Sequence, residues 1–138
     1  MTTHQGNPTI PTTQSLRANL ERLLASGRDG AMLRYGLGQA LLREEQFAAA
    51  EGHLREATRQ DPSYSAAWKL LGKALERLDR GDEAEVVWHH GLEAARERGD
   101  LQSIKEIEVF LKRRARARQA AAEEAASAQV PPSPSVNE

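Results

Sequence analysis

The chain has 138 residues, and its 19 lysines and arginines against 20 aspartates and glutamates give a formal net charge of -1. This length fits one domain, and the balanced charge lacks the positive excess of a dedicated nucleic-acid-binding protein. The absence of cysteine excludes disulfides, thiolate metal sites and a cysteine nucleophile. Because the apolar residues are mostly alanine and leucine, both good helix formers, the composition predicts a small, soluble, all-helical domain and does not indicate an enzyme.

The N-terminus has almost no apolar residues, and the C-terminal stretch SAQVPPSPSVNE is rich in proline and serine. We expect residues 1–13 to be a disordered tail and residues 119–138 to be a helical extension that fades into a disordered Pro/Ser-rich tail. Neither end can bury enough surface to offset the entropy of ordering. No apolar stretch of signal-peptide length follows Met1 and no run long enough to span a membrane occurs, so we expect a cytoplasmic protein.

Between the tails, apolar residues recur with the helical period in six segments. Ser15 is a suitable cap for the first helix and Ser65 for the fourth. Six helices with short connections leave no room for strands, which predicts an all-α fold with antiparallel neighbours. The breaks between the segments fall at residues 27–30, 43–46, 61–62, 79–82 and 99–100.

The chain aligns with itself when it is shifted by 34 residues, which places Leu37 on Leu71. The matches fall where helices must touch, because glycine and alanine let backbones approach closely while leucine and tryptophan fill the gaps between them. A repeated unit of this length predicts a stacked repeat architecture. The matched pairs are Leu37/Leu71, Gly38/Gly72, Ala40/Ala74, Leu41/Leu75, Arg43/Arg77, Ala50/Ala84 and Glu51/Glu85.

With this period and these residues, the chain resembles the tetratricopeptide repeat family, whose repeating unit is a helix–turn–helix of the same length. The first unit has Arg34 where the family has tryptophan, and it ends on the family's closing proline, Pro62. The second unit carries the family's residues Trp68, Leu71, Gly72 and Ala84, with Trp88 in the phenylalanine place.

The resemblance implies antiparallel helix pairs stacked as a short superhelix. We expect half a repeat, two full repeats at about 31–64 and 65–98, and a capping helix at about 100–118, together forming one domain over residues 14–118. Terminal repeats are expected to be atypical, and the last helix departs from the register, since Lys105 and Glu106 fall where the pattern has Leu-Gly.

No group of polar residues indicates catalysis. Gly36 and Gly38 form a fragment of a nucleotide-binding loop but lie inside a predicted helix with no strand before it. His53 and Glu56 have a spacing used by metal sites, although decoration of the surface with charge is the better interpretation. We therefore expect no catalytic residue, no cofactor and no metal.

In the resembled family, the first helix of each repeat lines a concave binding groove. The hypothesis is a non-catalytic interaction module or adaptor that binds an acidic peptide segment, because lysine and arginine donate charge-assisted hydrogen bonds to carboxylates. The alternative is a solvated helix face whose long side chains cover leucine and alanine. The matching groove residues are Tyr35, Gln39, Arg43, Lys69, Lys73 and Arg77.

Two other functions stay open, and the segment 112–118, with five positive residues in seven, suggests the first of them. One is contact with nucleic acid or an anionic surface. Nucleic acid is the less favoured partner, since no aromatic residue interleaves the arginines. The other is a self-associating structural subunit, a monomer or weak homodimer, in which Leu101, Ile104 and Ile107 pair with a second copy. A soluble helical extension, with its charges favoured by the helix dipole, stays open as the simpler interpretation.

Overall fold

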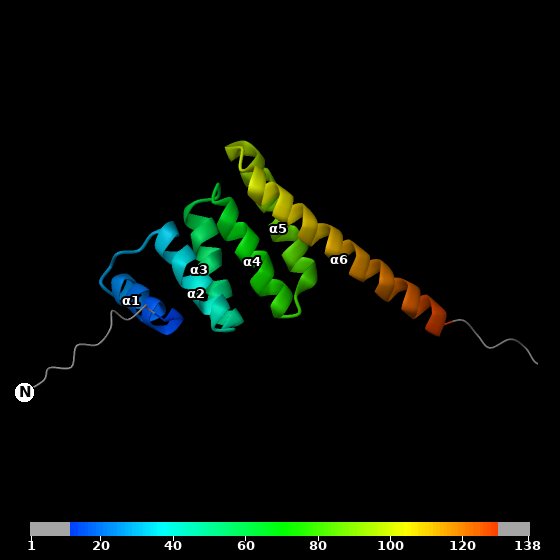
Figure 1. The fold of residues 1–138 in the computed structure, drawn as a ribbon, viewed down its shortest axis with the longest axis horizontal. Coiled ribbons are helices and arrows are strands. Elements are labelled where there is room, and N and C mark those ends of the chain that lie inside the picture. Colours follow the sequence, from blue (N-terminus) through cyan, green and yellow to red (C-terminus); the bar gives the residue numbers. More distant parts are fainter. Residues whose placement is uncertain (1–11, 130–138) are drawn as a thin grey trace, which may run out of the picture.

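The computed structural model describes residues 12–129, and in this part of the chain it contains six α-helices and no strand. The predicted all-α class is confirmed. The helices form one stack that begins at α1 and ends at α6 (Figure 1). Their bounds are α1 Thr13–Ala25, α2 Ala31–Arg43, α3 Phe47–Gln60, α4 Ser65–Arg77, α5 Gly81–Arg98 and α6 Leu101–Ala128.

The helices pack as the pairs that the resemblance implies. The most extensive packing joins α2 to α3 and α4 to α5, so each of these pairs is one repeat unit. Helix α1 packs on α2 as half a repeat, while α3 and α4 join the two units, and α6 covers α5. The first helices of the units, α2 and α4, also touch each other, and they form one side of the stack.

The turn inside each pair has the same geometry in both units. Glu45 and Asp79, which occupy the same position in the two units, both adopt the left-handed conformation, with φ of 58° and 61°. In each turn the next residue donates its N–H to a carbonyl of the preceding helix, at 2.8 Å and 2.9 Å. These bonds satisfy carbonyls at the helix end that would otherwise lack partners.

Helix α6 continues through the position where a third such turn would fall. Arg113 lies one repeat length after Asp79 but is helical, in a segment 112–115 of good helix formers without glycine or aspartate. The helix therefore has 28 residues, and its last part projects beyond the stack (Figure 1). Neither α6 nor any other helix within residues 12–129 is long and apolar enough to cross a membrane.

The first helix begins earlier than predicted. Thr12, rather than Ser15, is its N-cap, and the Thr12 side chain accepts a hydrogen bond from the backbone N–H of Ser15. Thr13, the last residue of the predicted tail 1–13, therefore opens α1. The rest of that tail up to residue 11, and residues 130–138 of the predicted C-terminal tail, lie outside the described residues.

The fourth helix also starts differently, because Ser65 is its first residue rather than its cap. The Ser65 hydroxyl instead donates to the carboxylate of Asp100 at 2.8 Å. Asp100 is the N-cap of α6 and accepts the N–H of Ser103 at 3.1 Å. The bonds from Ser103 and Ser65 lower the pKa of Asp100, and they tie the start of α4 to the start of α6.

The two helices of each unit approach closely at a glycine. A Cβ atom on Gly72 would lie 2.1 Å from Nε1 of the buried Trp88, so the indole ring fills the space that a side chain would occupy. The same nitrogen donates to the carbonyl of Lys69 at 3.0 Å. In the first unit, a Cβ atom on Gly38 would lie 2.4 Å from Cγ of Leu54.

We expect Gly72→Ala to lower the free energy of unfolding by about 1–3 kcal/mol, because overpacking against Trp88 outweighs the better helix propensity of alanine. Gly52→Ala is the control, since Gly52 is helical with open space around it, and it should raise that free energy by about 0.5–1 kcal/mol. Urea unfolding followed by far-UV circular dichroism measures both. A Gly72→Ala protein as stable as the control would contradict the close fit.

Candidate functional site

A shallow hollow of about 350 Å³ lies between α2 and α4. Residues three or four apart on a helix share one face, which is why each helix contributes a short series of side chains to it. Four of the six predicted groove residues, Gln39, Arg43, Lys73 and Arg77, meet in this hollow. The full lining is Gln39, Leu42, Arg43, Phe47, Leu70, Lys73, Glu76 and Arg77.

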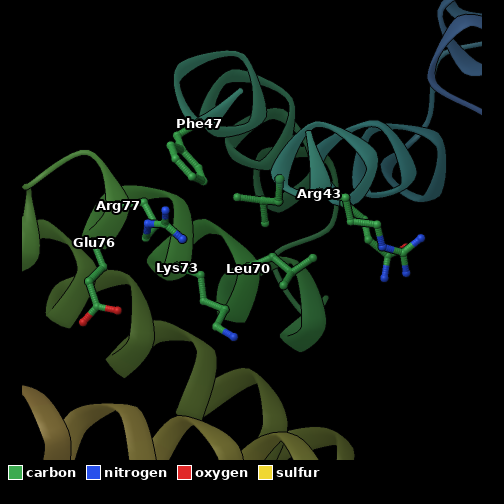
Figure 2. A pocket seen from close by; sticks show the side chains of 8 residues that line it. Arg43, Phe47, Leu70, Lys73, Glu76 and Arg77 are labelled. Carbon is green, nitrogen blue, oxygen red and sulfur yellow. The ribbon is translucent and has the colours of Figure 1, made fainter. Parts of the chain in front are cut away.

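The apolar part of the hollow comes from Leu42, Leu70 and Phe47, all half-buried. The guanidinium of Arg77 lies over the Phe47 ring, 4.4 Å from its centroid, as Figure 2 shows. Arg77 also contacts Glu45 at 3.4 Å, but both side chains are well exposed, so this ion pair contributes little. The ring thus holds Arg77 at the rim of the hollow while leaving its charge available.

Two further cations stand on the rim. Among residues 12–129, neither Arg43 nor Lys73 forms an ion pair, although the Lys73 ammonium lies 4.9 Å from the ring centroid of Phe110 in α6. Glu76 is the acidic residue of the lining and lies across the hollow from Arg43 (Figure 2). An apolar floor with three cations and one carboxylate can hold a carboxylate ligand by charge-assisted hydrogen bonds.

The other two predicted groove residues have partners inside the fold. The ring of Tyr35 packs against that of Tyr64, with centroids 5.0 Å apart. The ammonium of Lys69 donates to Glu106 of α6 at 2.9 Å, and only 17% of the Lys69 side chain is exposed. In this structure the positive charge that Lys69 was expected to add to the groove is paired with a carboxylate from α6. Lys69 stays a predicted groove residue.

Four residues of the hollow were not among the predicted site residues: Leu42, Phe47, Leu70 and Glu76. Phe47 belongs to the apolar stripe of its helix, and that pattern is typical of core. Phe47 is the first residue of α3 and follows the α2–α3 connection at Glu45. This position at a helix end is the one signal that Phe47 lies at the edge of the core. Leu42 and Leu70 are the sequence neighbours of the predicted residues Arg43 and Lys69. They were missed because the apolar pattern does not fix how far each helix is rotated about its own axis, and that rotation decides which neighbour faces the hollow.

The basic segment 112–118 is divided between two faces of α6. Arg114 contacts Asp82 at 3.6 Å and Glu85 at 4.0 Å, and Arg118 also pairs with Glu85. These two arginines pair with carboxylates near the start of α5 and so attach α6 to it. Three cations of the segment remain exposed on another face of the helix: Lys112, Arg113 and Arg116.

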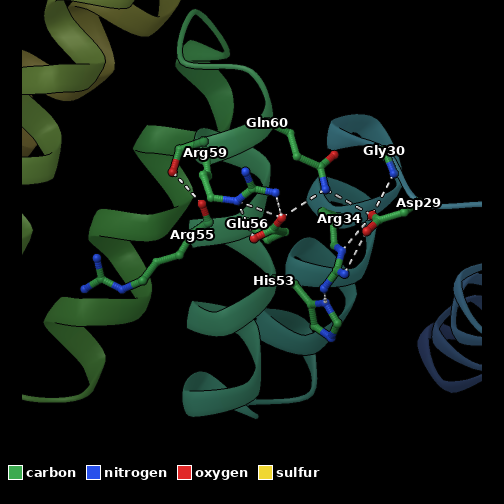
Figure 3. Close-up of polar contacts among 9 residues, drawn as sticks. Asp29, Gly30, Arg34, His53, Arg55, Glu56, Arg59 and Gln60 are labelled. Atoms are coloured by element: carbon green, nitrogen blue, oxygen red, sulfur yellow. Dashed lines mark hydrogen bonds and ion pairs between the residues drawn. The ribbon is translucent and has the colours of Figure 1, made fainter.

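The metal-spaced pair His53 and Glu56 belongs to a polar network that joins α2 to α3 (Figure 3). Arg34 donates to Asp29 at 2.9 Å and 3.0 Å and lies 3.2 Å from Nδ1 of His53. Gln60 donates to both Asp29 and Glu56 at 3.2 Å. Burial and the nearby Arg34 lower the pKa of His53. In the described part of the chain, no group of three or more His, Cys, Asp or Glu side chains could hold a metal ion.

Comparisons with known proteins agree with this fold. A family profile described as tetratricopeptide repeat matches residues 17–51 and 35–88. A tetratricopeptide repeat-containing protein of Pseudomonas aeruginosa is 46% identical over 99 residues, which cover 72% of this chain and 94% of that protein. The solution structure of a Bordetella parapertussis protein is 47% identical, with a TM-score of 0.66 over 74% of this chain and 89% of that one. The crystal structure of a tetratricopeptide repeat domain protein of Salinibacter ruber is 31% identical, with a TM-score of 0.60 over 63% of this chain and 97% of that one.

The contact between Lys69 and Glu106 predicts a measurable titration. The hydrogen bond from Lys69 lowers the pKa of Glu106, so the stabilisation is present above the unfolded value of about 4.3 and is lost as pH falls through the lowered value. By NMR, the titration midpoint of the Glu106 carboxyl should lie below about 4.3 and should rise in Lys69→Met. Lys105→Met, which removes an exposed neighbouring lysine, is the control and should leave it nearly unchanged. A midpoint that does not respond to Lys69→Met would disprove the pairing in solution.

Proposed function

Because the chain belongs to the tetratricopeptide repeat family, we propose that it is a non-catalytic interaction module that binds an acidic peptide segment in the hollow between α2 and α4. Tetratricopeptide repeats are generally protein-interaction modules, and stacked repeats present extended binding surfaces. The observation that carries the acidic preference is the apolar floor bordered by Arg43, Lys73 and Arg77.

The bound peptide would use both parts of the hollow. One of its apolar side chains covers Leu42 and Leu70, and its carboxylates accept hydrogen bonds from Arg43 and Lys73. Arg77, held by the Phe47 ring, gains a carboxylate partner with little loss of side-chain freedom, since its position is already restricted. The lining combines an apolar floor with cations that can pair with carboxylates, so binding is the chemistry that this surface supports best.

The affinity of such a site is expected to be modest and dependent on salt. Each exposed ion pair contributes about 0–1 kcal/mol, and exposed charges are screened at physiological ionic strength. Several carboxylates and the apolar contact must therefore act together, which favours a peptide with clustered acidic residues around one apolar side chain.

We expect a random-peptide display library, selected on the wild-type protein, to yield peptides enriched in aspartate and glutamate. The double variant Lys73→Glu/Arg77→Glu should bind the selected peptides about tenfold more weakly or worse, because it replaces two attractions by repulsions. Fluorescence anisotropy with labelled peptides measures the affinity, and circular dichroism checks that the helices persist.

Arg22→Glu/Arg28→Glu provides a control with the same change of net charge, since both arginines are exposed at the far end of the stack. This control should bind the peptides nearly as well as the wild type. Selected peptides without acidic enrichment, or equal binding by the groove variant and the control, would show that the hollow is not the site.

A further inference from the structure

Helix α6 occupies the place of a first helix that lacks its second helix. It contacts α5 and α4 in the same way as α4 contacts α3 and α2. In the pairs α2–α3 and α4–α5, the second helix covers the side of the first helix that faces away from the preceding helix in the chain. No helix within residues 12–129 covers the corresponding flank of α6. Two of its side chains, Leu101 and Val109, are 68% and 49% exposed and are among the most exposed large apolar residues described.

This uncovered flank is strongly basic. Residues at the spacing of 105, 109, 112 and 116 lie on one face of a helix, so Val109 is surrounded by cations. Val109, Lys112, Arg113 and Arg116 line a shallow hollow of about 220 Å³, and Lys105 is exposed one turn earlier. Among the described residues these four cations form no ion pair. Two carboxylates, Glu106 and Glu108, lie between them in the sequence, and Glu106 pairs with Lys69.

We propose that this flank binds an acidic amphipathic helix of a partner protein, which takes the place of the missing second helix. Its apolar face covers Leu101 and Val109, and its flanking carboxylates pair with the cations around Val109. The helix-in-groove mode of recognition uses apolar anchors at this spacing, and complementary charge selects the partner and speeds association. The proposal is independent of the peptide site between α2 and α4.

A second copy of the chain fits this flank less well. The other end of the stack, at α1, carries a hollow lined by Asn19, Arg22, Leu23, Ser26 and Arg28, which includes two cations and no carboxylate. Head-to-tail association would therefore place arginines against arginines, and two α6 flanks facing each other would do the same. Like charges facing each other across an interface are costly, so the charge pattern favours a partner with acidic side chains.

A nucleic acid also satisfies only part of the surface. Phosphates would pair with the cations but would leave Leu101 and Val109 without an apolar contact. Phe110, the aromatic residue of this part of α6, packs against Trp88 instead of standing among the cations where bases could stack on it. The combination of exposed apolar residues with surrounding cations is what an acidic amphipathic helix matches.

The test uses the full chain and a designed peptide probe of about four helical turns. The probe carries leucines on one face and glutamates on both sides of that face. A scrambled peptide of the same composition is the control for amphipathic order. We expect the wild-type protein to bind the ordered probe, with a gain of peptide helicity, and to bind the scrambled probe about tenfold more weakly, since only the ordered probe offers a continuous apolar face.

The variant Lys112→Glu/Arg113→Glu/Arg116→Glu should bind the ordered probe about tenfold more weakly or worse, because three attractions become repulsions. Arg22→Glu/Arg28→Glu/Arg96→Glu reverses three exposed charges elsewhere and should retain binding. The groove variant Lys73→Glu/Arg77→Glu should also retain it, so failure of the peptide site and failure of this flank are distinguishable.

Several outcomes would overturn the proposal. One is the absence of probe binding at low salt, and another is binding that survives the triple reversal at 112, 113 and 116. Binding of a short DNA duplex that is lost in that variant, without binding of the peptide, would assign the flank to nucleic acid. A dimer mass in sedimentation of the chain alone, lost in the same variant, would assign the flank to a second copy.

Discussion

The close approach of two helices at a glycine is the constraint on which the rest of the structure depends. The indole of Trp88 lies where Gly72 has no side chain, and Leu54 lies in the same way against Gly38. Because the Trp88 Nε1–H donates to a backbone carbonyl of α4, its polar atom is satisfied inside the core. These contacts fix the position of each first helix on its second helix, and α3 packs on both α2 and α4. The separation of α2 and α4, and hence the width of the hollow, follows from this packing.

A repeated ion pair extends the same geometry to the end of the stack. Arg80 donates to Glu51 at 2.7 Å, and Arg114 contacts Glu85 at 4.0 Å. Each partner in the second pair lies one repeat length after its counterpart in the first. Helix α6 therefore attaches to α5 with the repeat register, although its own Lys105 and Glu106 replace the family's Leu-Gly. The ion pair between Arg114 and Glu85 thus keeps the repeat length at α6, where the apolar residues no longer follow the repeat.

The fold was largely predictable from the sequence because its determinants are local and periodic. Leucines at helical spacing and the glycines at 38 and 72 define the pairs, and turn residues mark their ends. The helix starts were less predictable, since Ser15 and Ser65 are both suitable caps by residue type. The structure instead uses Thr12 at the first helix, and it directs the Ser65 hydroxyl to the distant Asp100.

The charges of the candidate site were predictable only where the repeat register holds. Arg43, Lys73 and Arg77 lie in the hollow because α2 and α4 follow the repeat. The pairing of Lys69 was not predictable, because its partner Glu106 comes from the helix that departs from the register. The basic segment divides for a different reason, since Arg114 and Arg118 find carboxylates on α5 once α6 is docked there.

The uninterrupted course of α6 has a mechanical consequence. The last ion pair between α6 and the stack is made by Arg118, yet the helix continues to Ala128. At about 1.5 Å per residue, the segment from Arg118 to Gln129 extends about 16 Å past that attachment. Had the chain turned at Arg113 as it does at Asp79, this segment would lie back against the stack. Instead, the end of α6 projects from the stack with residues 115–129 all exposed, and the helix keeps its far end away from the repeat surface.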